Sequence, residues 1–286
     1  MRVFLVPVAN RPECATALKT AFDLARRMDA SVEGYHMRPN QGAKVALPDD
    51  LSAQFGGDAL WHALARGKSG RKWVSGARGL FEEVAEHYDF DLAAKPSMKS
   101  HALWAEKVGS PEKLLAIHGP VSDLIVVSRP STRRSKLAGL FLQSAVLGTS
   151  RPVLIVPPRQ AKPIGAHIAI GWNRSAEAAA SVAAALPLLQ KAERVTILRG
   201  GPSVGAGPSS AHLAQYLKFY GINAKRVKAS QKLDDTEAIM TAYNDVGADL
   251  LVIGAYSRSR LRQRLLGGVT EFMLHKAKIP VLLKHH

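Results

Sequence analysis

The chain of 286 residues carries an internal repeat, and this repeat limits the possible folds more than any other feature of the sequence. An acidic residue precedes a short apolar run at Asp123 and again at Asp249. After a similar spacing, each of these runs is followed by another apolar run, which begins near Pro152 in the first copy and near Pro280 in the second. Self-similarity within a chain indicates that one structural unit occurs more than once.

Each copy begins with an apolar run that closes on an asparagine, Asn10 or Asn173, and an alanine-rich amphipathic segment follows. Short apolar runs bounded by turns are typical of strands buried on both faces. Because they alternate here with segments of helical period, they indicate βαβ units. We predict an α/β fold of two tandem, doubly wound, five-stranded parallel sheets. The expected strands are residues 2–8, 30–36, 101–107, 123–128 and 152–157 in the first copy, and 167–172, 194–199, 223–228, 249–254 and 280–284 in the second.

A proline-rich connector divides the two copies. Residues 157–163 hold three prolines and no apolar pattern, which is typical of a stiff linker. We therefore predict a first domain over residues 1–158 and a second over residues 165–286. The first also carries an excursion, roughly residues 38–68, that we expect to pack over the sheet or an edge. The glycine-rich stretch 200–210 is interpreted as a flexible loop between strand and helix.

Charge and cysteine content bear on location and partners. The formal net charge of +16 would attract anions such as nucleotides, nucleic acid or acidic membrane surfaces. The cations form no long runs, so a solvated basic surface explains the charge as well. The single cysteine, Cys14, cannot form an intramolecular disulfide and suits a reducing compartment. Because no segment approaches the ~18 apolar residues of a membrane helix, we expect a cytoplasmic protein with no membrane contact.

The segments that leave the first and fourth strands of each copy are the expected ligand sites. In open parallel sheets, ligands bind outside the carboxyl ends of the strands, where the strand order reverses. In the second copy, Ile253 and Gly254 end the fourth strand, and nine residues separate Ser257 from Gly267. Four arginines between them suit phosphate, and the helix expected to open at Gly267 and Gly268 would present unpaired N–H groups to an anion. These arginines are Arg258, Arg260, Arg262 and Arg264.

This layout resembles the universal stress protein family, and the resemblance extends over nearly the whole chain, twice. ATP-binding members of the family carry Gly-x-x-Gly, nine residues, and then Gly-Ser or Gly-Thr after the fourth strand. The resemblance implies a Rossmann-like fold of the adenine nucleotide alpha hydrolase type. It also implies a pseudo-dimer within the chain through the strand-five edges, with a homodimer as a further option. The expected site is Asn173, Ile253, Gly254, Ser257, Gly267, Gly268, Val269 and Thr270.

The second copy departs from the family pattern at three positions. Ser257 stands in place of the second glycine, and Gly268 in place of the hydroxyl residue, for which Thr270 could compensate. Asn173 stands where an aspartate is common, but its amide can still donate and accept hydrogen bonds. The first copy departs further, because its fourth strand ends in Ser128-Arg-Pro-Ser without a glycine. We therefore expect no phosphate loop in the first copy and at most one adenine nucleotide (ATP, ADP or AMP), or another anion, per chain.

Other chemistry finds little support in the sequence. No zinc-type spacing of histidine or cysteine occurs, and no Gly-x-Ser-x-Gly elbow or Walker loop. We therefore expect no metal site and no enzyme, and we interpret the chain as a non-catalytic stress-response protein. Two alternatives stay open: a scaffold of the same family whose pockets are closed by side chains such as Trp172, Tyr256 or Phe141, and a weak ATPase. Nucleic-acid binding rests on charge alone, because the tryptophans form no stacking stripe.

Overall fold

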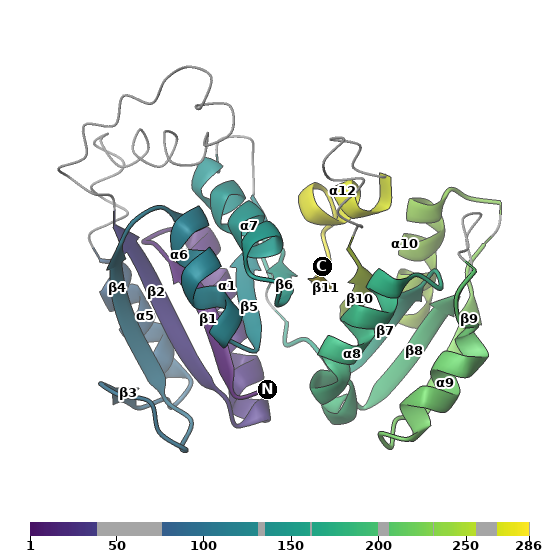
Figure 1. The fold of residues 1–286 in the computed structure, drawn as a ribbon, viewed down its shortest axis with the longest axis horizontal. Coiled ribbons are helices and arrows are strands. Elements are labelled where there is room, and N and C mark those ends of the chain that lie inside the picture. Colours follow the sequence, from purple (N-terminus) through teal and green to yellow (C-terminus); the bar gives the residue numbers. More distant parts are fainter. Residues whose placement is uncertain are drawn as a thin grey trace. The chain divides into compact units, whose positions relative to one another are not determined.

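The computed structural model describes residues 1–38, 76–130, 135–160, 162–199, 206–230, 232–255 and 268–285. The described chain divides into two compact units, Met1–Thr149 and Ser150–His286. The unit boundary lies just before the strand that begins at Pro152 (Figure 1). The domain ranges 1–158 and 165–286 stay predictions, and most of the excursion 38–68 lies outside the described residues.

The first unit is a parallel sheet with helices packed on it. Its strands lie in the order β3-β4-β2-β1-β5. β2, β4 and β3 lie on one side of β1 and β5 on the other, so the strand order reverses between β1 and β5. The elements are β1 (Val3–Val8), α1 (Pro12–Met28), β2 (Ser31–Arg38), α5 (Ala77–His87), β3 (Leu92–Ala93), β4 (Ala102–Val108), α6 (Pro111–His118), a 3-10 turn (Gly119–Val121), β5 (Leu124–Ser128) and α7 (Lys136–Gly148).

The second unit repeats the order of four of these strands, without a counterpart of β3, and adds two strands beyond the fourth. Its strands lie in the order β6-β11-β10-β7-β8-β9, and all neighbours are parallel except β6 and β11. The elements are β6 (Pro152–Val156), β7 (His167–Trp172), α8 (Ala176–Lys191), β8 (Arg194–Arg199), α9 (Ser210–Lys218), β9 (Ala224–Lys228), α10 (Asp235–Val246), β10 (Leu250–Gly254), α12 (Gly268–His275) and β11 (Val281–Lys284).

The predicted fold class is confirmed: the protein is α/β, with doubly wound parallel sheets. Gly171 of β7 faces Ile239 of α10, whereas Gly254 of β10 faces Ala178 of α8. Ile170 of β7 pairs with Val252 of β10, and successive residues of a strand point to opposite faces. Gly171 and Gly254 therefore point to opposite faces of the second sheet, and so α8 and α10 cover opposite faces. The expected strands all occur within two residues of their predicted ends. The expected fifth strand of the first copy, β6, pairs with β11 of the second unit in an antiparallel register.

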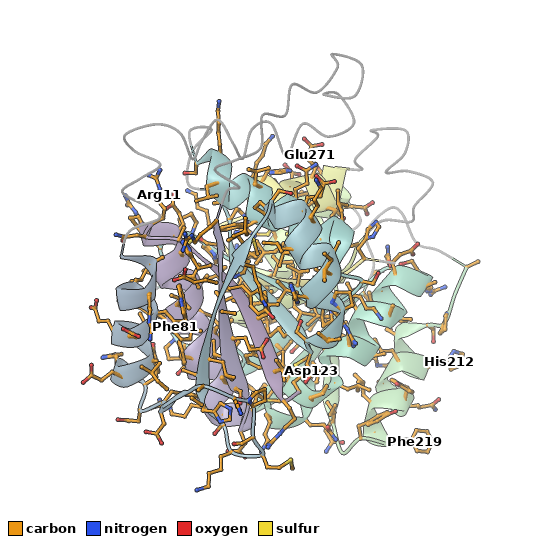
Figure 2. The ribbon with its side chains drawn as sticks, turned by 60° about the vertical axis from the view of Figure 1, so that its left-hand side comes forward. Arg11, Phe81, Asp123, His212, Phe219 and Glu271 are labelled. Carbon is orange, nitrogen blue, oxygen red and sulfur yellow. The ribbon has the colours of Figure 1, made fainter. Side chains whose placement is uncertain are left out.

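The repeated aspartates hold the two central strands of each unit together at their amino ends. Asp249 lies just before β10, and its carboxylate accepts hydrogen bonds from the backbone N–H groups of Gly165, Ala166 and His167 at the start of β7. Asp123 likewise accepts from the N–H groups at the start of β1. Figure 2 shows Asp123 and Arg11 at opposite ends of the first unit. The aspartates are thus structural, and the carboxyl ends of the strands stay open to other roles.

Candidate functional site

The centre of the second unit has the geometry of a ligand site in a doubly wound sheet. β10 pairs with β7 in a parallel register, so both strands end at the same edge of the sheet. β8 and β9 lie on one side of this pair, and β11 on the other. The strand order therefore reverses between β7 and β10, where open α/β sheets bind ligands. Ile253 and Gly254 end β10, and Asn173 follows β7, so these residues lie at the same edge of the sheet.

Gly254 is needed for a close approach between β10 and α8. A Cβ atom at this position would lie 2.5 Å from the backbone nitrogen of Ala178, in the first turn of α8. A side chain would therefore push the helix away from the strand. The sequence predicted Gly254 as part of the expected nucleotide site. The structure gives it a packing role, which also fixes the first turn of α8 beside the end of β10.

Asn173 begins the turn that leads from β7 into α8. Its side chain is exposed, and its Oδ1 accepts a hydrogen bond of 3.1 Å from the backbone N–H of Ser175. Arg174 adopts a left-handed backbone with φ of 65°. The Ser175 hydroxyl then accepts from the N–H of Ala178, which caps the helix. The amide oxygen of Asn173 thus shapes this turn, and its amide NH₂ is the group that remains suited to a ligand.

The loop before α9 is tied to the same edge of the sheet. The indole Nε1 of Trp172 donates a 2.9 Å hydrogen bond to the carbonyl of Pro208. A Cβ on Gly207 would lie 2.1 Å from the carbonyl oxygen of Arg174, so only glycine fits there. The described end of the glycine-rich stretch is therefore held by specific contacts. Trp172 is buried in these contacts.

The helix α12 follows β10 along the chain and begins at Gly268 (Figure 1). Val269 is half-buried and Thr270 is buried in its first turn. The first N–H groups of a helix have no intrahelical partner, so this turn presents backbone donors of the kind that suit an anion. The other predicted site residues, Ser257 and Gly267, lie outside the described residues, as do Tyr256 and the four arginines between them.

The equivalent place in the first unit holds a carboxylate of the chain itself. Glu13, in the first turn of α1, accepts a 2.9 Å hydrogen bond from the hydroxyl of Ser135, which precedes α7. Arg129, which follows β5, is only 2% exposed, and burial lowers its pKa to about 10. The sequence did not predict this arrangement, because residues from α1 and α7 meet only once the sheet has formed. The second unit carries a glutamate at the same position of its first helix, Glu177 of α8, so the hydrogen bond to Ser135, and not the carboxylate alone, is what is particular to the first unit.

The described residues offer little for chemistry other than binding. Burial raises the pKa of the Cys14 thiol to about 12, which removes the thiolate needed for nucleophilic attack. Within the ranges that the structure covers, no three histidine, cysteine, aspartate or glutamate side chains gather as a metal site. No helix among the described residues is long and apolar enough to cross a membrane.

Comparisons with known proteins agree with this architecture. Residues 175–285 match the model of the Universal stress protein family. A universal stress protein from Archaeoglobus fulgidus DSM 4304 superposes with a TM-score of 0.65 at 12% identity, covering 99% of this chain and 96% of that chain. A functionally unknown protein from Pseudomonas aeruginosa PAO1 gives a TM-score of 0.51 at 17% identity, covering 99% and 92%. No curated protein matches the sequence.

The two kinds of similarity bear on different parts of the chain. The structural likeness extends over nearly the whole chain but at low identity, so it concerns the fold. The family match is a sequence match, and it covers α8 to β11; β7 and Asn173 lie just before the matched residues. The chain thus has a fold similar to that of the universal stress proteins along its length, and residues 175–285 match the model of the Universal stress protein family.

Proposed function

We propose that this protein is a non-catalytic stress-response protein that binds one adenine nucleotide (ATP, ADP or AMP) per chain, in its second unit. The observation that carries the proposal is the junction of β7 and β10. It places Asn173, the backbone of Gly254 and the first turn of α8 at one edge of the sheet, with α12 following β10. Asn173 would contact the base or ribose, and Gly268, Val269 and Thr270 would contact the phosphates.

The first unit supports a single site rather than two. Its fourth strand ends in Ser128-Arg-Pro-Ser, without the glycine that ends β10, and the Ser135 hydroxyl before α7 is bonded to Glu13. The first unit would then act as a structural partner of the second. The proposed setting is the cytoplasm, which the single cysteine suits.

Binding is tested by calorimetric titration of the full chain with ATP, ADP and AMP. Thr270→Val keeps the shape of the buried side chain and removes its hydroxyl. Because a hydrogen bond to a charged group contributes about 1.5–3 kcal/mol, we expect affinity to fall at least tenfold. Ser135→Ala removes the counterpart hydroxyl in the first unit and serves as the matched control, with unchanged affinity expected.

Three results would contradict the proposal. If none of the three nucleotides binds the unaltered chain, the scaffold of the same family becomes the better interpretation. If Ser135→Ala weakens binding as much as Thr270→Val does, the site does not lie in the second unit. Steady release of phosphate from ATP above background would instead favour the ATPase alternative.

A further inference from the structure

One stretch of the second unit is strongly cationic. Residues 194–233 contain seven lysines and arginines and no aspartate or glutamate. Nearly half of the formal net charge of +16 therefore lies in this short part of the chain. The stretch forms β8, α9 and β9. The seven cations are Arg194, Arg199, Lys218, Lys225, Arg226, Lys228 and Lys232.

Three of these seven cations lie on the strand at the edge of the sheet. β9 is the last strand of the second unit and pairs only with β8 among the described strands, with Arg199 opposite Lys228. Lys225, Arg226 and Lys228 are all exposed on this five-residue strand. In the parts of the chain that the structure covers, none of the seven cations forms an ion pair. Their charge is thus available to a partner.

Aromatic side chains lie next to these cations at the end of α9. The Phe219 ring is 89% exposed, and Figure 2 shows it projecting from the surface of the second unit. Tyr216 and Tyr220 flank it, with ring centroids 5.2 Å apart and hydroxyl oxygens 3.3 Å apart. The carbonyl of Tyr220 accepts a hydrogen bond from Gln190 of α8, which anchors the turn. Only a short turn separates Tyr220 from β9, so the rings lie near the start of this edge strand.

Edge-strand protection explains only part of this arrangement. Lysines on an edge strand discourage pairing with other sheets. That role accounts for cations on β9, but it requires neither an exposed phenylalanine nor the absence of acidic residues across three elements. A membrane surface is also a poor fit. Peripheral membrane helices present a broad apolar face, whereas Leu213 and Leu217, the leucines of α9, are buried in the unit.

We propose that the β9 edge surface, defined by Tyr216, Phe219, Tyr220, Lys225, Arg226 and Lys228, binds single-stranded nucleic acid. The cations contact phosphates, and the aromatic rings stack on unpaired bases, as in sequence-tolerant single-strand binding. The tryptophans that argued against nucleic acid in the sequence play no part here. The relevant rings belong to tyrosine and phenylalanine, which the fold places beside the charges.

The test is fluorescence anisotropy with the full chain and labelled 15-nucleotide strands of deoxythymidine and of uridine, over a range of salt concentrations. Stacking contributes about 1–3 kcal/mol per base, so Phe219→Ala should weaken binding about 5- to 100-fold without changing the salt slope. Lys225→Gln/Arg226→Gln/Lys228→Gln removes three phosphate contacts. At about 0.7 per contact, the slope of log affinity against log salt should become shallower by about 2.

The control removes the same charge elsewhere, by Lys19→Gln/Lys95→Gln/Lys99→Gln on exposed positions of the first unit. Binding in this variant should match that of the unaltered chain. Thr270→Val should also bind the strands normally, which separates this surface from the nucleotide site. The proposal is overturned if the unaltered chain does not bind the strands, if Phe219→Ala has no effect, or if the control loses as much affinity as the β9 variant. Binding to phosphatidylserine vesicles in place of the strands would also overturn it.

Discussion

At the scale of single residues, the repeated aspartates show how a sequence pattern acquires a physical meaning. The sequence showed only that an aspartate precedes the fourth strand of each copy. The structure shows that each carboxylate bonds the backbone at the start of the first strand. These bonds connect strands that are far apart in the chain but adjacent in the sheet. The aspartates thus stabilise the central pair of strands on which the candidate site depends.

We expect Asp249→Asn to lower the free energy of unfolding by about 2–3 kcal/mol. The substitution removes the charge that three backbone N–H groups share and turns an amide NH₂ toward some of them. Urea unfolding followed by circular dichroism measures the change. Asp245→Asn, an exposed aspartate in α10, is the control and should change stability little. Equal effects of the two substitutions would argue against the role given to Asp249.

A second residue-scale prediction concerns His36, which is 2% exposed in β2. Its Nδ1 lies 2.9 Å from the carbonyl of Val8, and its ring stacks on Trp104. Burial lowers the pKa of His36; the Val8 carbonyl and the charge of Glu106 partly oppose this effect, and Arg38 adds to it. The folded protein therefore holds a neutral imidazole at pH values where the unfolded chain is protonated.

The stability that depends on neutral His36 is complete above the unfolded pKa of about 6.5 and is lost as the pH falls below it. We expect the unaltered chain to lose more stability between pH 7.5 and pH 5.5 than His36→Gln does. Chemical unfolding at both pH values measures the two losses. The pKa values of His118 and His167 are also lowered, but the unaltered chain and His36→Gln both contain these histidines. The difference between the two losses of stability therefore reports on His36. Identical losses in the two proteins would contradict this account.

At the scale of elements, the sequence predicted most of the fold and less of the packing. Buried parallel strands are continuous apolar runs with sharp ends, so their ranges could be predicted closely. β3 was missed because it has only two residues, and Leu92 is exposed, so it carries no apolar pattern. The contact between Gly254 and α8 could not be predicted, because it joins elements whose spacing is set only by the folded sheet.

We expect Gly254→Ala to destabilise the protein by about 1–3 kcal/mol, because the added methyl group would overlap the first turn of α8. Gly79→Ala in α5 is the matched control. No atom lies near its Cβ position, and alanine suits a helix better than glycine, so stability should rise by up to about 1 kcal/mol. Thermal unfolding checks both. Stability unchanged by Gly254→Ala would mean that β10 and α8 can separate without cost.

The placement of β6 gives another element-scale prediction. β6 follows the first copy in sequence, yet it pairs with β11 through four residues of each strand. Hydrogen exchange should therefore slow to the same degree in residues 153–156 and 281–284. The short strand β3, at the edge of the first unit, should exchange faster than either. Fast exchange in β6 alongside slow exchange in β11 would show that the pairing does not protect this strand.

At the scale of the whole molecule, the two units share one topology but differ in the chemistry of the corresponding edges. The sequence predicted this difference from the absence of a glycine after the fourth strand of the first copy. It could not show that Glu13 and Ser135 meet there, because they are far apart in the chain. The sequence also showed only that the cations form no long runs, whereas the fold places Lys225, Arg226 and Lys228 on an exposed edge strand.

The central claim is that two related units provide one nucleotide site per chain. Native mass spectrometry of the full chain with ATP, ADP and AMP counts the bound nucleotides directly. The account predicts one nucleotide per chain, unchanged in Ser135→Ala and depleted in Thr270→Val. Two bound nucleotides per chain, or none with any of the three, would contradict it.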